Sequence, residues 1–400
     1  MRVKAFCCLL GIGVLHNIIL INITRITCCG VMTTNNKKLI VLATGGTGGH
    51  VFPAEALAEV LLARGHRVIL ITDKRFANFK TGALSRIETL TIRTGTFVGS
   101  PVKKIMGILG LGVGMAQALV LMGRLKPDVV VGFGGYPSFP TLFAAAKLRI
   151  PTIIHEQNSV LGRANRLLAG KVERIATSFP NTLMVEEKDK GKIVVIGNPV
   201  RASVKTIRNL PYSPITQDGK VNILVTGGSQ GATIFSQVVP AAIATLPDNL
   251  RARIRVDQQC READVEATRA AYTQLGINAD IAAFFVDLPT RLAGAHLVIA
   301  RSGASTVFEL AVAGRPAILV PLPTSMDNHQ YYNANAFEDV GGGWVMSQDG
   351  FTAASLAARL EAFITAPDTL SRAAENAKKL DAGNAAENLA EIVLGVSSPI

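Results

Sequence analysis

The sequence predicts an α/β protein in which two Rossmann-like domains, each built on a parallel sheet, face a central cleft. Two glycine-rich turns carry this prediction, ATGGTGGH at 43–50 and VTGGSQGA at 225–232. Each turn follows a run of apolar residues that is typical of a buried parallel strand. A turn of this kind before a helix directs backbone N–H groups at an anion, usually a phosphate. One turn in each half therefore predicts an anion-binding site in each domain.

The composition is that of a globular protein with an anionic partner. The chain has 400 residues, 48% hydrophobic and 18% charged, which is enough for two domains. Its formal charge of +12 favours a phosphorylated ligand or an anionic membrane surface. Nucleic acid is a poorer match, because aromatic residues make up only 6% and no Lys/Arg-rich tract is present.

Residues 1–33 form an apolar extension that contains basic but no acidic residues. Residues 5–23 predict a membrane anchor or a signal peptide, although no small-x-small cleavage site is evident. The alternative is a mis-assigned start, with translation beginning at Met32. Four of the five cysteines lie here in adjacent pairs that match no usual zinc spacing, and Cys260 lies in the body of the chain. This cysteine usage indicates a reducing, cytosolic compartment.

The first domain is expected over residues 34–198. Residues 39–42 predict its first strand, Pro53 suits the first turn of the helix that follows, and residues 68–71 predict the second strand. Residues 105–122 carry no charge, contain four glycines and follow Lys103 and Lys104. They predict either a flexible loop followed by a buried helix or an exposed apolar loop that rests on an anionic bilayer.

Polar residues follow the next two predicted strands, in VVVGFGGYPSFP at 129–140 and IIHEQN at 153–158. The carboxyl ends of parallel strands are where open α/β sheets bind ligands, so these residues predict a site for a hydroxyl-rich substrate. The polar and glycine residues placed there are Gly134, Gly135, Tyr136, His155, Glu156, Gln157 and Asn158. Alternatively, Glu156 and Asn158 cap a helix that begins near Gly162.

The second domain is expected over residues 199–374, and a polar, proline-containing linker at 202–220 precedes its first strand. Residues 221–226 predict its first strand, and LVIARSGASTVFEL at 297–310 predicts a strand, a small-residue turn and a helix. Ser302 or Ser305 is expected to cap this helix, and Thr306 with Glu309 has capping-box spacing. Glu309 is expected either to accept hydrogen bonds from a ribose or to be a structural carboxylate. The following polar loop is expected to recognise sugar hydroxyls through Asp327, Asn328, His329, Gln330 and Asn333.

Seven motifs, in order, resemble those of one family: GGTGGH, GGY, HEQN, GNPVR, GGSQGA, RSGA and DNHQYYNA. The family is that of the bacterial undecaprenyldiphospho-muramoylpentapeptide β-N-acetylglucosaminyltransferases, which convert lipid I to lipid II in peptidoglycan synthesis. The resemblance covers about residues 37–395. It implies a GT-B fold, with a helix at 375–394 of the C-terminal segment 375–400 packing back on the first domain. It also implies a peripheral protein on the cytoplasmic face of the bacterial plasma (inner) membrane.

The resemblance implies that UDP-N-acetylglucosamine lies mainly on the second domain and the undecaprenyl-linked acceptor, lipid I, on the first. The diphosphate would contact Ser229, Gln230, Ala304, Ser305 and Thr306, with Arg201 also among the donor contacts. Val286 would meet uracil through its backbone, Glu309 the ribose, and Gln330 and Asn333 the sugar. From the first domain, the sugar would be approached by Thr47, Gly48, Gly49 and Asn158. The acceptor diphosphate would lie near His50, Tyr136, Glu156 and Asn165. Ser305 departs from the leucine of some members, and the N-terminal extension is the largest departure.

An inverting transfer needs a base for the acceptor hydroxyl and a way to stabilise the departing diphosphate. His50 is the preferred base, because imidazole titrates near neutral pH and a helix start disfavours its protonated form. Glu156 is the rival base, and His50 would alternatively order the loop or bind the acceptor diphosphate. No D-x-D motif is present, so no metal or other cofactor is expected, and helix starts, backbone amides and an arginine would carry the leaving-group charge.

Three other classes remain as alternatives. A dinucleotide-dependent oxidoreductase would use the first turn with Asp73, but Val51 occupies the position of the third glycine. Another GT-B enzyme of UDP-sugars, either a lipid glycosyltransferase or a sugar-nucleotide epimerase, would share the fold. A non-catalytic nucleotide binder at the membrane surface is the third alternative.

Overall fold

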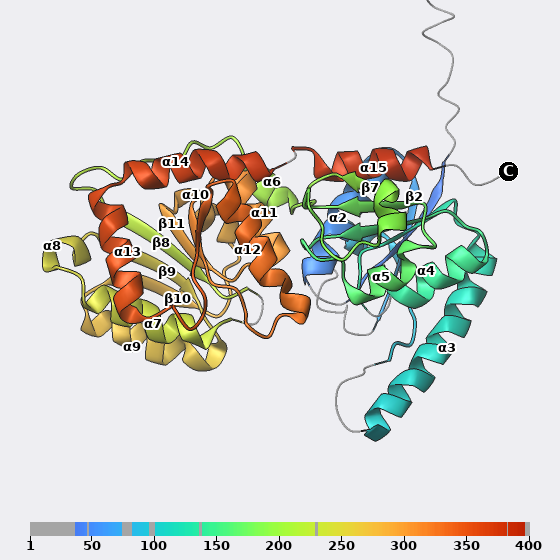
Figure 1. The fold of residues 1–400 in the computed structure, drawn as a ribbon, viewed down its shortest axis with the longest axis horizontal. Coiled ribbons are helices and arrows are strands. Elements are labelled where there is room, and N and C mark those ends of the chain that lie inside the picture. Colours follow the sequence, from blue (N-terminus) through green and yellow to red (C-terminus); the bar gives the residue numbers. More distant parts are fainter. Residues whose placement is uncertain are drawn as a thin grey trace, which may run out of the picture. The chain divides into compact units, whose positions relative to one another are not determined.

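The structure is a computed structural model that describes residues 37–45, 48–73, 82–95, 101–135, 138–228, 231–381 and 383–396, except the side chains of 101–106, 108 and 109. The described residues form two parallel sheets, which confirms the predicted α/β class with two Rossmann-like domains (Figure 1). Both sheets belong to one compact unit of the chain, Leu39–Ile400. The predicted extension at 1–33, including Met32, lies outside the described residues.

The first sheet has the strand order β3-β2-β1-β4-β5-β6-β7. Its strands are β1 (Leu39–Ala43), β2 (Arg67–Thr72), β3 (Glu88–Thr91), β4 (Val129–Gly132), β5 (Thr152–Glu156), β6 (Arg174–Thr177) and β7 (Ile193–Val195). The helices beside it are α2 (Gly48–Ala63), α3 (Pro101–Leu125), α4 (Ser138–Lys147) and α5 (Arg163–Ala169), with the 3₁₀ turns η2 (Gly82–Arg86) and η3 (Glu187–Lys192). Alternate residues of β1 serve the two faces: Ile40 and Leu42 pack in a core with α2, while Val41 and Ala43 pack with α3 and α4.

The second sheet has the strand order β10-β9-β8-β11-β12-β13. Its strands are β8 (Val221–Thr226), β9 (Ile254–Gln259), β10 (Asn278–Ala282), β11 (Leu297–Ala300), β12 (Ala317–Leu319) and β13 (Gly343–Val345). Its longer helices are α7 (Thr233–Ala244), α9 (Val265–Gln274), α10 (Leu288–Gly294), α11 (Ala304–Ala313), α12 (His329–Asp339), α13 (Ala353–Thr365) and α14 (Asp368–Ala377). Shorter turns are α6 (Ala202–Lys205), α8 (Asp248–Arg251), η4 (Glu262–Asp264), η5 (Met326–Asn328) and η6 (Lys378–Leu380).

The two sheets reverse their strand order at equivalent places. The first sheet reverses between β1 and β4 and the second between β8 and β11, and both pairs are parallel. The two glycine-rich turns follow β1 and β8, so each turn lies at the topological switch point of its sheet. This is the position at which open α/β sheets bind ligands.

The helix α15 (Ala385–Gly395) packs against the first sheet although it comes last in the chain (Figure 1). Its Leu389, Ala390 and Val393 share a core with α2 and β1, and Arg64, directly after α2, pairs with Glu391 at 2.7 Å. The predicted helix at 375–394 is wrong in its extent, because α14 and η6 end before Asp381 and α15 begins at Ala385. Gly383, with φ +84°, lies in this break. The domain limits remain predictions.

Two further expectations for the first domain are wrong. The helix α2 begins at Gly48, so Pro53 lies inside it rather than in its first turn, and His50 is in that turn instead. Residues 105–122 form no loop, because α3 runs without interruption from Pro101 to Leu125. Its Ala118 and Met122 are buried, whereas Val113, Leu119 and Val120 are exposed. Among helices of the described residues, none is both long and apolar enough to cross a membrane.

Candidate functional site

His50 is the last residue of the first glycine-rich motif and lies in the first turn of α2. The imidazole is half-buried. Its pKa is lowered to about 4, mainly because burial disfavours the charged ring and also because His329 is nearby. His50 is therefore neutral at pH 7, but its ring titrates well below the near-neutral pH on which the preference for it as base was founded.

The His50 ring lies against the turn that follows β4. A Cβ atom on Gly134 would lie only 3.1 Å from Cδ2 and Nε2 of His50, and Gly134 has a φ of +89°. The backbone N–H of Gly45 donates to the carbonyl of Gly134 at 3.1 Å, which joins the turns after β1 and β4. Glycine is thus needed at position 134 both for its backbone conformation and for the space that the ring occupies.

Glu156, at the end of β5, is buried and accepts hydrogen bonds on both carboxylate oxygens. Oε1 accepts from the backbone N–H and side-chain amide of Asn158 at 3.0 and 3.2 Å. Oε2 accepts from the backbone N–H of Gly162 and the side-chain amide of Asn165, both at 2.8 Å. Burial raises the pKa of Glu156, and these hydrogen bonds oppose the rise. Gly162 is the N-cap of α5, so Glu156 fixes the backbone just before the helix, but α5 has no side-chain cap, and the capping role expected for Glu156 and Asn158 is not observed. A role for Glu156 as base stays a prediction.

Asn333 of α12 connects the segment after β5 to the turn after β11. Its Oδ1 accepts from the backbone N–H and the hydroxyl of Ser159, both at 2.8 Å. Its Nδ2 donates to Oδ1 of Asn158 and to the carbonyl of Ser302, both at 3.1 Å. The side chain is fully buried, so Asn333 would have to exchange one of these bonds to contact a sugar.

Glu309 of α11 forms an ion pair with Arg201. Nε and a terminal guanidinium nitrogen of Arg201 approach Oε1 of Glu309 at 2.8 and 2.7 Å. Burial raises the pKa of Glu309, and the charge of Arg201 opposes that rise. The Arg201 guanidinium also lies 4.7 Å from the centre of the Phe52 ring of α2. Both guanidinium contacts use Oε1, and no other side chain or backbone group among the described residues donates to Oε2.

The predicted cap of α11 is wrong. The N-cap is Gly303, and no side chain caps the helix. The hydroxyl of Ser302 instead donates to the carbonyl of Gln330 at 2.7 Å, and Oγ of Ser305 is buried without a hydrogen-bond partner among the described residues. Ala304, Ser305 and Thr306 therefore form a first turn whose backbone N–H groups have no side-chain cap.

The other predicted residues differ in their surroundings. Gln330 accepts from the backbone N–H of Leu322 at 3.0 Å, so its side chain orders the loop before α12. Val286 is 89% exposed after β10, while Gly48 and Gly49 begin α2. Thr47, Tyr136, Ser229 and Gln230 lie outside the described residues. Within the described part of the chain, no cluster of three or more His, Cys, Asp or Glu side chains could hold a metal ion, and a reaction without metal stays a prediction.

Two arginines of α5 escaped prediction. Arg163 and Arg166 pair with the two oxygens of Asp327 at 3.2 and 2.5 Å. Asp327 has a φ of +50°, in the left-handed region that non-glycine residues rarely adopt. The i, i+3 spacing of the arginines on one helix face was the available signal, but their partner is more than 160 positions away.

Comparisons with known proteins agree with this architecture. Residues 40–177 match the glycosyltransferase family 28 N-terminal domain, and residues 222–391 match the glycosyltransferase family 28 C-terminal domain. Two relatives are named UDP-N-acetylglucosamine–N-acetylmuramyl-(pentapeptide) pyrophosphoryl-undecaprenol N-acetylglucosamine transferase. The protein from Paramagnetospirillum magneticum is 55% identical over 91% of this chain and 98% of its own length. The protein from Rhodospirillum centenum is 52% identical over 90% and 94%.

A solved structure, that of MurG from Acinetobacter baumannii, is similar to this chain with a TM-score of 0.73 at 30% identity, covering 90% of this chain and all of that one. The likeness includes both domains, because it covers 90% of this chain. The chain therefore belongs to the family of the UDP-N-acetylglucosamine–N-acetylmuramyl-(pentapeptide) pyrophosphoryl-undecaprenol N-acetylglucosamine transferases.

Proposed function

We propose that this enzyme transfers N-acetylglucosamine from UDP-N-acetylglucosamine to the muramoyl sugar of undecaprenyl-diphospho-muramoylpentapeptide, converting lipid I to lipid II in peptidoglycan synthesis. The observation that carries the chemistry is the neutral His50 in the first turn of α2, beside the glycine-rich turn. The donor side is supported by the uncapped start of α11 and by the Arg201–Glu309 pair. Family membership supports the identity of both substrates.

In the proposed reaction, His50 accepts the proton of the acceptor hydroxyl as that oxygen attacks the anomeric carbon of the donor. The bond from the anomeric carbon to the UDP oxygen breaks on the opposite side, which inverts the configuration and releases UDP. The negative charge that develops on the diphosphate is stabilised by backbone N–H groups of the second glycine-rich turn and of the α11 start, with Arg201. No metal takes part in this scheme.

Glu309 is proposed to bind the ribose of the donor. Its Oε1 is held by Arg201, and Oε2 accepts from a ribose hydroxyl. The pair thus orients the carboxylate before the donor arrives, which lowers the entropy cost of binding. Val286 is proposed to meet the uracil, and Gln330 and Asn333 the sugar.

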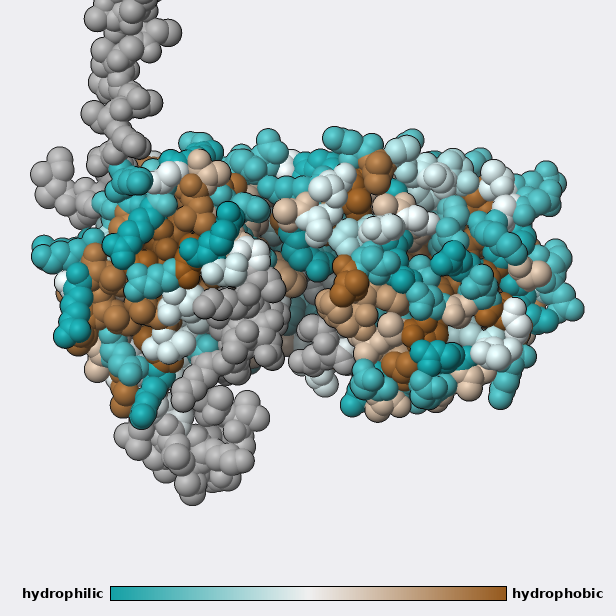
Figure 2. All heavy atoms as spheres, turned by 180° about the vertical axis from the view of Figure 1, so that it is seen from behind, coloured by the Kyte–Doolittle hydropathy of each residue, from teal (hydrophilic) through white to brown (hydrophobic). Residues whose placement is uncertain are grey.

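The enzyme is proposed to act as a peripheral protein at the cytoplasmic face of the inner membrane, where its product serves cell growth, shape and division. Figure 2 shows hydrophobic residues gathered on the N-terminal domain, at the left of that view, with hydrophilic residues around them. Val113, Leu119 and Val120 of α3 are exposed on the same domain. The excess of basic residues supports attraction to anionic lipids.

A transfer assay tests the proposal. Full-length protein is supplied with a lipid I analogue and, in parallel, with UDP-N-acetylglucosamine, UDP-glucose or a purine-diphosphate sugar. We expect acceptor-dependent UDP release and a disaccharide product with the first donor alone, at the same rate with and without EDTA. Product from UDP-N-acetylglucosamine in the absence of acceptor would instead indicate an epimerase, and UDP binding without turnover a non-catalytic protein.

A further inference from the structure

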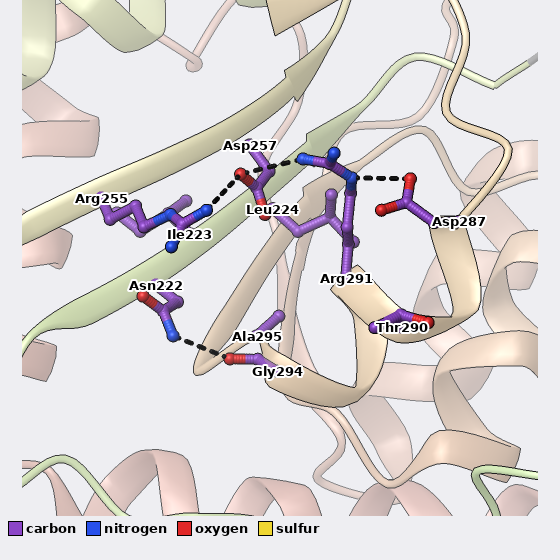
Figure 3. Close-up of a pocket in the computed structure, with 10 residues that line it drawn as sticks. All are labelled: Asn222, Ile223, Leu224, Arg255, Asp257, Asp287, Thr290, Arg291, Gly294 and Ala295. Carbon is purple, nitrogen blue, oxygen red and sulfur yellow. Dashed lines mark hydrogen bonds and ion pairs between the residues drawn. The ribbon is translucent and has the colours of Figure 1, made fainter. Parts of the chain in front are cut away.

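Arg291 lies in a pocket of the second domain where side chains of β8, β9 and α10 meet (Figure 3). Its guanidinium nitrogens approach three carboxylates: Asp257 of β9 at 3.1 Å, Asp280 of β10 at 2.7 Å and Asp287 at 2.9 Å. Asp287 is the N-cap of α10. One arginine therefore joins two neighbouring strands to the segment that leaves the second of them.

The same guanidinium also holds an aromatic ring. Its central carbon lies 3.9 Å from the centre of the buried Phe285 ring. Arginine stacks on an aromatic ring better than lysine does. Its planar guanidinium can also pair with several carboxylates at once, which the single ammonium group of lysine does less well. Arg291 thus anchors residues 285 and 287, and Val286 between them is 89% exposed.

The anchored segment lies at the ligand-binding edge of the second sheet. Gln259, at the end of β9, donates to the carbonyl of Ala283 at 3.1 Å and accepts from the hydroxyl of Thr226 at 3.0 Å. The Thr226 hydroxyl in turn accepts from the backbone N–H of Gly228 in the second glycine-rich turn, at 3.3 Å. This chain of hydrogen bonds connects the turn after β8 with the segment after β10, across the carboxyl ends of three parallel strands.

Two apolar side chains of this segment are largely exposed. Phe284 is 69% exposed and Val286 89% exposed, although Phe285 between them is buried. If UDP-N-acetylglucosamine places its diphosphate on the second glycine-rich turn, the adjacent segment is within reach of its nucleobase. This step rests on the proposed function.

We propose that Arg291 is a positioning residue for the donor: it holds the segment Phe284–Asp287 in the conformation that receives the nucleobase, without touching the donor itself. Ordering this segment before binding removes an entropy cost that each donor molecule would otherwise meet. Arg291 should therefore control the affinity for UDP and the donor KM, and leave kcat and the acceptor KM unchanged.

The test compares Arg291→Ala with Arg255→Ala, a matched control in the same pocket whose guanidinium is half exposed and 3.8 Å from Asp257. UDP affinity is measured by calorimetry, and donor KM, acceptor KM and kcat by the transfer assay. We expect Arg291→Ala to weaken UDP binding and to raise the donor KM by about tenfold, which corresponds to a loss of 1.4 kcal/mol of binding free energy. Arg291→Lys should retain only part of the wild-type UDP affinity. Arg255→Ala should change neither the UDP affinity nor the donor KM by more than about twofold.

A second variant keeps the test decisive if Arg291→Ala does not fold. Asp287→Asn weakens only the contact from the segment, at a carboxylate that is about half exposed, and leaves Asp257 and Asp280 paired. A smaller rise in the donor KM, with an unchanged melting temperature, is expected. UDP affinity equal to that of the wild type in both variants overturns the inference, as does a parallel loss of kcat, acceptor affinity and stability. If the wild-type protein binds UDP but transfers no sugar, the proposed function fails, while the UDP affinities still decide the role of Arg291.

Discussion

The ligand-binding edges of the two sheets each hold a buried glutamate, and the two carboxylates have opposite surroundings. Glu156, at the end of β5, accepts four hydrogen bonds from neutral N–H groups, all within ten residues of it in the chain. Glu309, in α11, contacts one cation, Arg201, through one of its two oxygens. Burial raises the pKa of both carboxyl groups. Both oxygens of the first carboxylate accept hydrogen bonds from its own domain, whereas Oε2 of the second accepts none from the described residues.

This difference indicates how the work is divided between the domains. At the first edge, Glu156 organises the backbone before α5, and the half-buried His50 is the base that we propose. At the second edge, an ion pair and an uncapped helix start are the groups that we propose for binding the anionic donor. Replacements at the first edge should therefore change kcat or stability, and those at the second edge should change the donor KM.

The largest effect is expected from His50→Ala. Removing a general base should lower kcat by roughly 10²–10⁴-fold. Donor KM and melting temperature should change little, and steady-state kinetics with both substrates varied would measure this. If kcat is near normal and the acceptor KM rises, His50 binds the acceptor diphosphate and the division between the two edges is wrong.

A smaller effect is expected from Glu309→Gln. A hydrogen bond to a charged group contributes about 1.5–3 kcal/mol, so the donor KM should rise about 10–100-fold while kcat stays within a few-fold. Competition with UDP and with its 2′,3′-dideoxy analogue would show whether the loss concerns the ribose hydroxyls. Equal losses for both ligands would place the contact of Glu309 elsewhere.

Glu156→Gln should affect stability more than chemistry. The substitution replaces one carboxylate oxygen by an amide N–H₂ group, which cannot accept the hydrogen bonds that this oxygen now receives. A buried hydrogen-bonding group left unsatisfied lowers the free energy of unfolding by about 1–3 kcal/mol. The melting temperature of the first domain should fall, with kcat of the folded enzyme within about tenfold of the wild type. Glu187→Gln, at an exposed glutamate of η3, is the control. An unchanged melting temperature together with a kcat lowered about 100-fold would make Glu156 the base instead.

The pH dependence of kcat/KM and that of kcat should differ, because the first reports the pKa of His50 in the free enzyme and the second its pKa in the substrate complex. The pKa of His50 is about 4 in the fold and 6.5 as the reference value, so its neutral form is stabilised. Its contribution to stability is complete above pH 6.5 and is lost as the pH falls toward 4, because the unfolded chain then binds more protons. The acid limb of kcat/KM should accordingly lie near pH 4, and that of kcat should lie higher, since bound diphosphates favour the charged ring. His50→Gln should remove this limb.

The sequence predicted the regular parts of the fold well, because their signals are local. Apolar runs marked β1, β2 and β8, and the glycine-rich turns marked the switch point of each sheet. Local signals failed where a distant group competed for the same atom. Ser302 has the right chemistry to cap α11, but its hydroxyl donates to the carbonyl of Gln330, which is 28 positions away.

The amino-acid sequence by itself determined the two parallel sheets, the turns at their carboxyl ends and the residue types gathered there, since strand alternation and glycine conformations depend on neighbours in the chain. The tertiary structure decided which polar groups meet. Arg201 and Glu309 are 108 positions apart, and Ser159 and Asn333 are 174 positions apart. Only the packed sheets and helices bring such pairs within hydrogen-bonding distance, and burial then fixes their protonation, as it does for His50.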